Sequence, residues 1–194
     1  ALTEDVFAFY LGHESAGELV IGGVDPSHYT GEFSYLPVQN MVPGRMGYWE
    51  IKMDSFQING ESVVSTNKAI VDSGTSLLAL PTKDMKAIAK LLGAKSVLPI
   101  PPFNKEFMID CDSAGPDMDI ILGGKTYTLT KQDYIIDDAG QCLLGATGID
   151  IPAPAGPLAI LGDVFMRAHY VSFDFAKQQI GLAKIVKTSS AVQV

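Results

Sequence analysis

The chain has 194 residues, enough for one good-sized domain and slightly short for two independent ones. Its composition, 47% apolar and 19% charged, predicts a folded protein with a core rather than a disordered chain. The net charge of −8 argues against a nucleic-acid partner, and no apolar run reaches the roughly 18 residues of a membrane span.

Short strand-like segments separated by turns dominate the first half of the chain. The alternating or β-prone segments are Val6–Leu11, Glu18–Ile21, Glu32–Val38, Trp49–Asp54 and Ala69–Val71. Asn59-Gly60 is a strong turn signal after one of them. This half of the sequence therefore predicts several short β-strands and no helix.

The second half adds helical spacing and a hairpin signal. Met85, Ile88, Ala89 and Leu92 recur at helical intervals, which predicts a helix with Thr82 as its N-cap and Gly93 past its end. A shorter helix is expected after Gly162-Asp163. Met118–Leu122 and Lys125–Leu129 flank Gly123-Gly124, a hairpin signal, and the prolines of Ile151–Pro157 predict a stiff surface loop. The pattern predicts a mostly-β single domain with one or two short helices.

The two cysteines and three histidines carry little information by themselves. Cys111 and Cys142 lack the clustered spacing of a zinc site, and they can be read either as one disulfide or as two buried free thiols. His13, His28 and His169 form no ligand pair or triad by spacing, and we expect each to be a surface or loop residue.

The segment Ile70-Val71-Asp72-Ser73-Gly74-Thr75-Ser76 carries the most informative chemistry. An apolar strand delivers the Asp72 carboxylate to a tight turn that contains a glycine, and hydroxyl side chains surround that carboxylate. This placement suits a catalytic aspartate, because the strand fixes its position while hydroxyls and backbone N–H groups can hydrogen-bond it. A plain Asp-Ser-Gly turn between two strands fits the same residues, since short motifs recur by chance.

Motifs for other chemistries are missing from the sequence. It contains no G-x-S-x-G elbow, Walker A loop, H-E-x-x-H motif or G-x-G-x-x-G motif. Asp110-Cys111-Asp112 and Asp117-Met118-Asp119 lack the spacing of a calcium loop and are interpreted as solvated acidic turns. We expect no metal and no cofactor.

Several further segments extend the resemblance that the Asp72 motif suggests. In chain order they are Gly17–Asp25, Tyr29–Gly31, Tyr48–Ile51, Ala69–Ser76, Met108–Cys111, Gly148–Pro152, Ile160–Phe165, Val171–Asp174 and Ile180–Ala183. Together they resemble the C-terminal lobe of pepsin-like aspartic proteases, and most of all the cathepsin D group. The resemblance covers nearly the whole chain, so residues 1–194 are expected to form one lobe of the bilobal pepsin-like acid protease fold, with the N-terminal lobe absent.

The resemblance assigns roles to individual residues. Asp72 would be one of two catalytic aspartates, with its loop packed under the turn at Leu161-Gly162. Ser73 would replace the usual Thr, whose hydroxyl links the two aspartate loops across the lobe junction, and Thr75 would hydrogen-bond the Asp72 carboxylate. Substrate contacts are expected from Gly74, Thr75, Ser76, Ile70, Tyr48, Ile149 and Ile151. Cys111 and Cys142 would form the lobe disulfide, which implies an oxidising compartment, either lysosomal, vacuolar or secreted.

The chain carries only half of the active site that the resemblance implies. The mechanism needs two carboxylates that share a proton, and the sequence contains one such motif. We therefore expect an aspartic endopeptidase that works at acidic pH when paired with its N-terminal lobe, the isolated chain being inactive or nearly so. Two alternatives stay open: a self-associating homodimer with one aspartate from each copy, and an inactive lobe that binds peptides or its partner.

Overall fold

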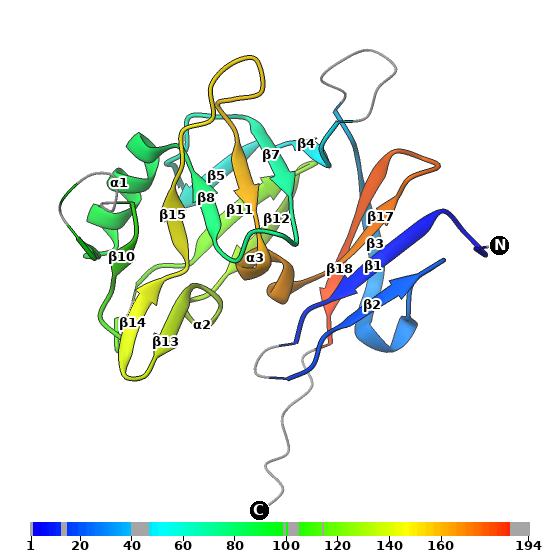
Figure 1. The fold of residues 1–194 in the computed structure, drawn as a ribbon, viewed down its shortest axis with the longest axis horizontal. Helices are drawn as coiled ribbons and strands as arrows, with labels where there is room; N and C mark the ends of the chain where they lie inside the picture. The colour runs from blue at the N-terminus through cyan, green and yellow to red at the C-terminus, as the bar shows by residue number, and fades with distance from the viewer. Residues whose placement is uncertain are drawn as a thin grey trace, which may run out of the picture. The chain divides into compact units, whose positions relative to one another are not determined.

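The computed structural model describes residues 2–12, 15–39, 47–98, 100, 105–113 and 115–186, and Figure 1 labels its strands and helices. The described chain is mostly β, as the sequence predicts, and none of its helices is long and apolar enough to cross a membrane. It forms two compact units, one made of Ala1–Val38 with Met166–Val194 and the other of Gln39–Phe165. The assignment of the chain to a single C-terminal lobe stays a prediction.

The first unit is built on one antiparallel sheet with the strand order β2-β1-β17-β18-β3. Its elements are β1 (Val6–Tyr10), β2 (Glu18–Ile21), the 3-10 helix η1 (Pro26–His28), β3 (Tyr29–Pro37), β17 (His169–Asp174) and β18 (Gln179–Ile185). Aromatic rings fill its core, where Tyr29 stacks on the buried Tyr170 with ring centroids 5.3 Å apart. The three strands expected in this region of the sequence are confirmed, with ends shifted by a few residues.

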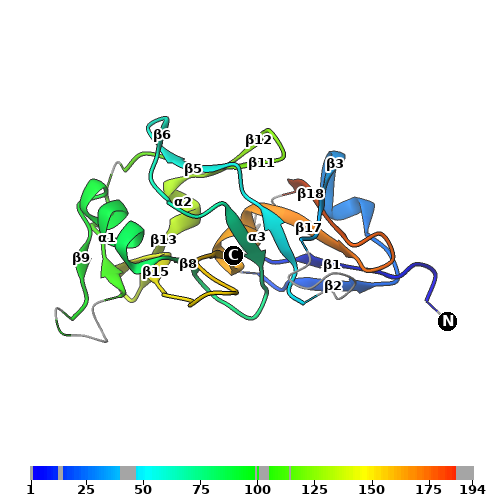
Figure 2. The same cartoon turned by 90° about the horizontal axis from the view of Figure 1, so that it is seen from above.

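The described residues of the second unit form three sheets, and Figure 2 shows some of their strands from above. The five-stranded sheet has the order β15-β8-β16-β7-β4, with strands Ala146–Gly148, Leu78–Leu80, Ala159–Leu161, Lys68–Val71 and Glu50–Lys52. A four-stranded sheet joins β12 (Lys125–Leu129), β11 (Met118–Leu122), β5 (Ser55–Ile58) and β6 (Glu61–Ser62). The third sheet joins β13 (Ile135–Asp138), β14 (Gln141–Leu144), β10 (Phe107–Met108) and β9 (Lys95–Ser96).

The predicted hairpin between β11 and β12 is confirmed. Leu122 pairs with Lys125, so Gly123 and Gly124 form a two-residue turn. Their φ angles of 57° and 75° are both in the left-handed region, which is the geometry of a type I′ turn. Glycine is favoured here because it adopts positive φ without a steric penalty.

The helices agree with the sequence in part. α1 (Thr82–Leu91) and α3 (Asp163–Ala168) are the two helices expected from the sequence. The predicted N-cap is wrong, because Pro81 occupies that position and Thr82 is already helical. The third helix, α2 (Lys131–Tyr134), was not expected, since one turn is too short to show apolar periodicity.

Two further expectations from the sequence are corrected by the fold. His169 is buried rather than exposed, because it begins β17, a strand with neighbours on both sides. Asp119 lies within β11 rather than in an acidic turn, and the Thr128 hydroxyl on the paired strand donates to its carboxylate at 2.6 Å. His13 lies outside the described residues.

Cys111 and Cys142 form a disulfide, so the reading as two free thiols is wrong. The bond joins the turn that follows β10 to strand β14, where Cys142 is buried. The N–H of Ile109 also donates to the carbonyl oxygen of Cys142, at 2.9 Å. The disulfide therefore fixes the turn against a strand that the backbone has already brought close.

Removal of this disulfide is expected to lower stability clearly. It closes a loop between positions 31 apart, and a crosslink of that span stabilises by roughly 3–4 kcal/mol in the chain-entropy model. A Cys111→Ala/Cys142→Ala variant should therefore melt roughly 10 °C lower than the parent. Calorimetry checks this, and treatment of the parent with a reductant should reproduce the shift while leaving the variant unchanged.

Candidate active site

Strand β7 places Asp72 at the end of a buried element. β16 pairs with it in parallel on one side and β4 in antiparallel fashion on the other. Ala69, Ile70 and Val71 are all at least nine-tenths buried, so neighbours hold the strand on both faces. Asp72 follows directly and is partly exposed. A central strand thus delivers one carboxylate to the surface at a fixed position.

Both oxygens of the Asp72 carboxylate accept hydrogen bonds from the turn that follows. The Gly74 N–H donates to Oδ1 at 3.0 Å, and the Thr75 hydroxyl donates to Oδ2 at 2.7 Å. A Cβ atom at Gly74 would lie only 3.2 Å from Oδ1, which explains why a residue without a side chain suits this position. The turn therefore orients the carboxylate, as the sequence predicts for Thr75.

A second loop interlocks with the Asp72 turn. The Asp72 N–H donates to the Leu161 carbonyl oxygen at 3.2 Å, and the Asp163 N–H donates to the Thr75 carbonyl oxygen at 2.8 Å. Between them stands Gly162, where a Cβ atom would lie 2.1 Å from that same Thr75 oxygen. The backbones approach so closely that only glycine fits, and the expected packing of Asp72 under the Leu161-Gly162 turn is present.

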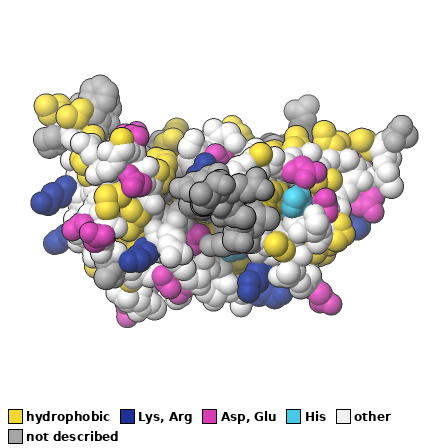
Figure 3. All heavy atoms as spheres, turned by 90° about the horizontal axis from the view of Figure 1, so that it is seen from below, with side chains coloured by type: hydrophobic (Ala, Val, Ile, Leu, Met, Phe, Trp, Pro, Cys, Tyr) yellow, Lys and Arg dark blue, Asp and Glu magenta, His cyan; other side chains and the backbone are white. Residues whose placement is uncertain are grey.

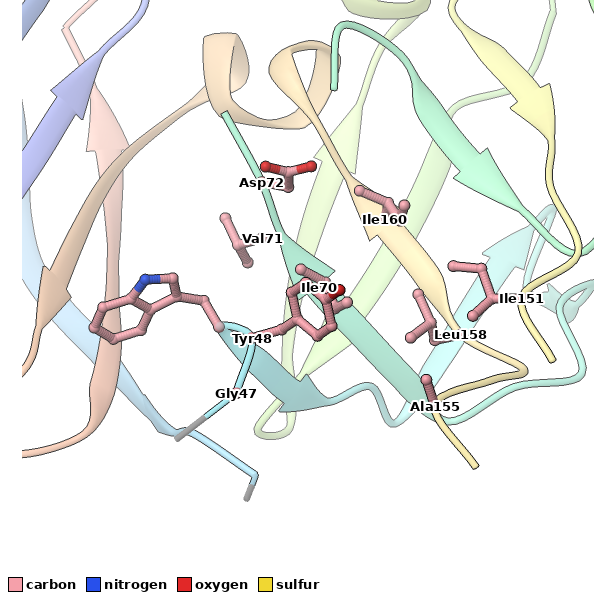
Figure 4. A pocket seen from close by; sticks show the side chains of 10 residues that line it. Gly47, Tyr48, Ile70, Val71, Asp72, Ile151, Ala155, Leu158 and Ile160 are labelled. Carbon is pink, nitrogen blue, oxygen red and sulfur yellow. The ribbon is translucent and has the colours of Figure 1, made fainter. Parts of the chain in front are cut away.

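An apolar pocket of about 280 Å³ adjoins the carboxylate, and Figure 4 shows its lining. Ile70, Tyr48 and Ile151, three residues expected to contact substrate, border it together with Asp72. The Tyr48 side chain is 58% exposed, which leaves it accessible from solvent. Asp72 is the only carboxylate among the described residues that line the pocket. The pocket can thus receive an apolar side chain beside the Asp72 carboxylate.

The other predicted site residues lie near Asp72 or farther along the same segments. Ser73 and Ser76 are exposed on the Asp72 turn, and neither lines the pocket. Ile149 is partly buried beside β8, where its N–H donates to the Leu80 carbonyl oxygen at 2.8 Å, and it also stays outside the lining.

Sequence reasoning missed several apolar lining residues, among them Leu158 and Ile160. Ile160 stands opposite Ile70 in the parallel pair of β16 and β7, so it faces the same side of the sheet. The alternation of Leu158 and Ile160 is a usable signal, but only the sheet register shows that these two positions face Asp72.

Asp150, between the two predicted isoleucines, anchors the start of α1. Its carboxylate accepts hydrogen bonds from the Thr82 hydroxyl at 2.7 Å and from the Thr82 N–H at 3.0 Å. The Thr82 hydroxyl is the main cause, and the N–H the second, of a pKa of Asp150 below its ordinary value. Asp150 thus holds the loop at the edge of the pocket onto the helix.

We expect the Asp150–Thr82 contact to weaken in acid. Because the folded-state pKa is lowered, the contact stabilises the fold above the ordinary aspartate pKa and is lost as pH falls through the lowered value. An Asp150→Asn variant should therefore be less stable than the parent at pH 6 and nearly equal to it at pH 2. Denaturant unfolding at both pH values tests this, with Asp138→Asn as a control; a stability difference that does not change with pH would contradict it.

Comparisons with known proteins agree with this geometry. A family model described as eukaryotic aspartyl protease matches residues 1–185. The chain is 43% identical over 194 residues to cathepsin D of Chionodraco hamatus, an alignment that covers 93% of the chain and 46% of that relative. It is 38% identical over 190 residues to vacuolar protease A of Aspergillus fumigatus, covering 94% of the chain and 45% of that relative.

The matches cover nearly all of this chain but only part of each relative. The chain spans about half the length of the curated relatives that it matches. The family model, in contrast, runs through nearly all of the chain, including the interlocked loops at Asp72 and Gly162. The chain belongs to the eukaryotic aspartyl protease family.

Proposed function

We propose that this chain supplies one half of the active site of an aspartic endopeptidase, with Asp72 as one of its two catalytic carboxylates. The observation that carries the proposal is the placement of Asp72. A buried strand holds it, two hydrogen bonds orient its oxygens, and an apolar pocket opens beside it. The second carboxylate would come from an N-terminal lobe.

Two carboxylates close together can divide the chemistry of peptide hydrolysis. Two carboxyl groups at short distance do not both ionise, because their negative charges repel each other. One of them therefore keeps a proton while the other stays charged. The charged one accepts a proton from a water molecule, whose oxygen attacks the peptide carbonyl carbon, while the protonated one donates to the carbonyl oxygen. When the tetrahedral intermediate collapses, the carboxyl that took a proton from water gives it to the amide nitrogen, a hydroxyl of the intermediate returns a proton to the other carboxylate, and the C–N bond breaks to release the amine and the carboxylic acid.

The surrounding residues would orient the partner lobe and the substrate. The Ser73 hydroxyl is exposed on the Asp72 turn and can link to the matching loop of the other lobe. Gly74 and Ser76 are exposed on the same turn, where they can meet a substrate backbone. Tyr48, Ile70 and Ile151 line the pocket and would favour a large apolar side chain beside the scissile bond. Ile149 and Thr75, which do not line the pocket, would support these contacts through their neighbours.

Length favours an N-terminal lobe over a second copy of this chain as the partner. The curated relatives are about twice as long as the region that this chain matches, which leaves room for another lobe in each. The name of vacuolar protease A supports a lysosomal or vacuolar location, and the disulfide supports a chain that folds in the oxidising secretory pathway, which is also the route of secreted proteins.

The test is a cleavage assay on the chain with and without an N-terminal lobe. The two lobes, co-expressed and purified together, should cleave an unfolded protein at acidic pH, and a peptide analogue with a hydroxyl at the scissile position should block cleavage. The isolated chain should be silent. Failure of the paired lobes to cleave would overturn the proposal, and activity rising with the square of the isolated chain's concentration would point instead to a homodimer.

A further inference from the structure

Three side chains with metal-binding atoms meet in the first unit, whereas Asp72 belongs to the second. They are Glu18 on β2, Asp25 just before η1, and His28 at the end of η1, and their donor atoms lie within 4.8 Å of one another. It is the only such group of three among the residues that the structure describes. Figure 3 shows one face of the molecule, where a histidine side chain reaches the surface with acidic side chains near it.

The sheet and the core rings hold this group in place. Glu18 stands directly opposite Tyr10 in the pairing of β2 with β1. The imidazole of His28 stacks on the Tyr10 ring, with centroids 4.1 Å apart and an interplanar angle of 14°. The register and the stacking together bring the His28 ring to the Glu18 carboxylate.

The backbone of Asp25 is fixed as well. Its N–H donates to the Tyr170 hydroxyl at 3.0 Å, and Tyr170 is a core residue. One carboxylate oxygen of Asp25, Oδ1, accepts from the Ser27 N–H at 2.8 Å, which leaves the other oxygen turned toward His28. The strand pairing, the ring stacking and these hydrogen bonds therefore hold the three side chains in a preorganised group.

A hydrogen bond between His28 and Glu18 does not account for the whole arrangement. The Nε2 atom of His28 lies 2.7 Å from a Glu18 oxygen and 4.0 Å from Oδ2 of Asp25. One ring nitrogen carries at most one proton, so it can donate to Glu18, while its 4.0 Å separation from Asp25 Oδ2 is too long for a hydrogen bond. Two carboxylates facing one imidazole nitrogen are better satisfied by a cation that binds all three.

The distances suit a small transition-metal ion. Zinc binds imidazole nitrogen and carboxylate oxygen at about 2.0–2.2 Å, so neighbouring donors of a tetrahedral site stand roughly 3.3–3.6 Å apart. The observed separations of 2.7 and 4.0 Å lie on either side of that value, and all three donor atoms lie within 4.8 Å of one another, so the side chains would adjust slightly when the ion binds. Calcium fits less well, because it prefers six or more oxygen ligands and no imidazole.

We propose that Glu18, Asp25 and His28 form a binding site for a divalent transition-metal ion, with Zn²⁺ as the ion that it fits. Each side chain supplies one donor atom and water completes the coordination. The ion would join Glu18 on the edge strand β2 to Asp25 and His28 at η1, which follow it by seven and ten residues. This site is separate from the proposed peptide hydrolysis and needs no second lobe.

The experiment titrates Zn²⁺ alone into metal-free protein at neutral pH by calorimetry. Three variants each remove one ligand while keeping its shape: Glu18→Gln, Asp25→Asn and His28→Phe, the last of which retains a ring to stack on Tyr10. Each should weaken binding at this site by roughly ten-fold or more, or abolish it. Glu32→Gln removes the same charge from an exposed position on β3 and should bind as the parent does.

A second measurement separates loss of the site from loss of the fold. Zn²⁺ should raise the melting temperature of the parent and of Glu32→Gln, and should leave the three ligand variants unchanged. If His28→Phe fails to fold, Glu18→Gln decides the matter, since Glu18 is exposed. Equal zinc affinity and stoichiometry in the parent and all three variants would overturn the proposal, as would Ca²⁺ binding as tightly as Zn²⁺.

Discussion

Replacing Asp72 with Asn is expected to abolish peptide cleavage by the two-lobed protein while leaving the fold intact. An amide cannot take a proton from water or exchange one with the second carboxyl, so the loss of rate should lie in the range of roughly 10²–10⁴-fold or beyond. The fold should survive because Asn has nearly the same shape. Its oxygen can still accept one of the two hydrogen bonds that Gly74 and Thr75 donate to Asp72.

Initial rates on an unfolded protein substrate, together with a melting curve, test this expectation. Asp112→Asn is the matched control, since it removes the same charge from an exposed turn outside the pocket and should cleave at the parent rate. A folded Asp72→Asn protein that retained near-parent turnover would show that Asp72 is not a catalytic carboxylate. The same variant leaves the group of Glu18, Asp25 and His28 untouched, so zinc binding should be unaffected.

Substitution of Gly162 by alanine is expected to have the largest effect on folding. The added Cβ would lie 2.1 Å from the Thr75 carbonyl oxygen and 2.4 Å from that of Leu77. Both obstacles are backbone atoms, which cannot rotate away as a side chain would. We expect a loss on the order of 3 kcal/mol or more in the free energy of unfolding, since overpacking against a rigid neighbour forces the two loops apart.

Denaturant unfolding of Gly162→Ala measures this loss directly. Gly47→Ala provides the control, because a Cβ atom there meets nothing within 4 Å, and its stability should match that of the parent. If Gly162→Ala folds but its loops have separated, peptide cleavage should fall with the stability, because Leu161 and Asp163 no longer hold the Asp72 turn. A variant as stable as the parent would mean that the two loops are not interlocked in solution.

Part of the fold could be predicted from local patterns. Alternating or β-prone residues indicated β1, β2, β3, β4, β7, β11 and β12, which are fewer than half of the described strands, and Gly123-Gly124 indicated the hairpin, because these signals lie within a few neighbouring positions. The single-turn helix α2 escaped because it offers no periodicity, although Thr130 and Asp133 form a capping box that could have marked it. The two-residue strands β9 and β10 are too short to show alternation.

The candidate site likewise has one part that a local motif predicts and another that depends on strand pairing. Asp72, Gly74 and Thr75 are adjacent in sequence, so a motif could indicate their hydrogen bonds. The contribution of Ile160 depends on the register between β16 and β7, which no local pattern specifies. The meeting of Glu18 with His28 depends on strand pairing and ring stacking together, and the spacing of the histidines alone gave no hint of it.

The pairing of β7 with β16 has a consequence for the order of folding. The Thr66 hydroxyl, just before β7, donates to the Pro157 carbonyl oxygen, and the two residues are 91 positions apart. At a synthesis rate of about 5–20 residues per second, the partner of β7 leaves the ribosome roughly 5–20 seconds after it. Until then the Asp72 turn lacks the Leu161 carbonyl and the Asp163 N–H that brace it. A nascent chain therefore carries the Asp72 sequence without its geometry, and the carboxylate is held in place only after the residues up to Asp163 have been synthesised.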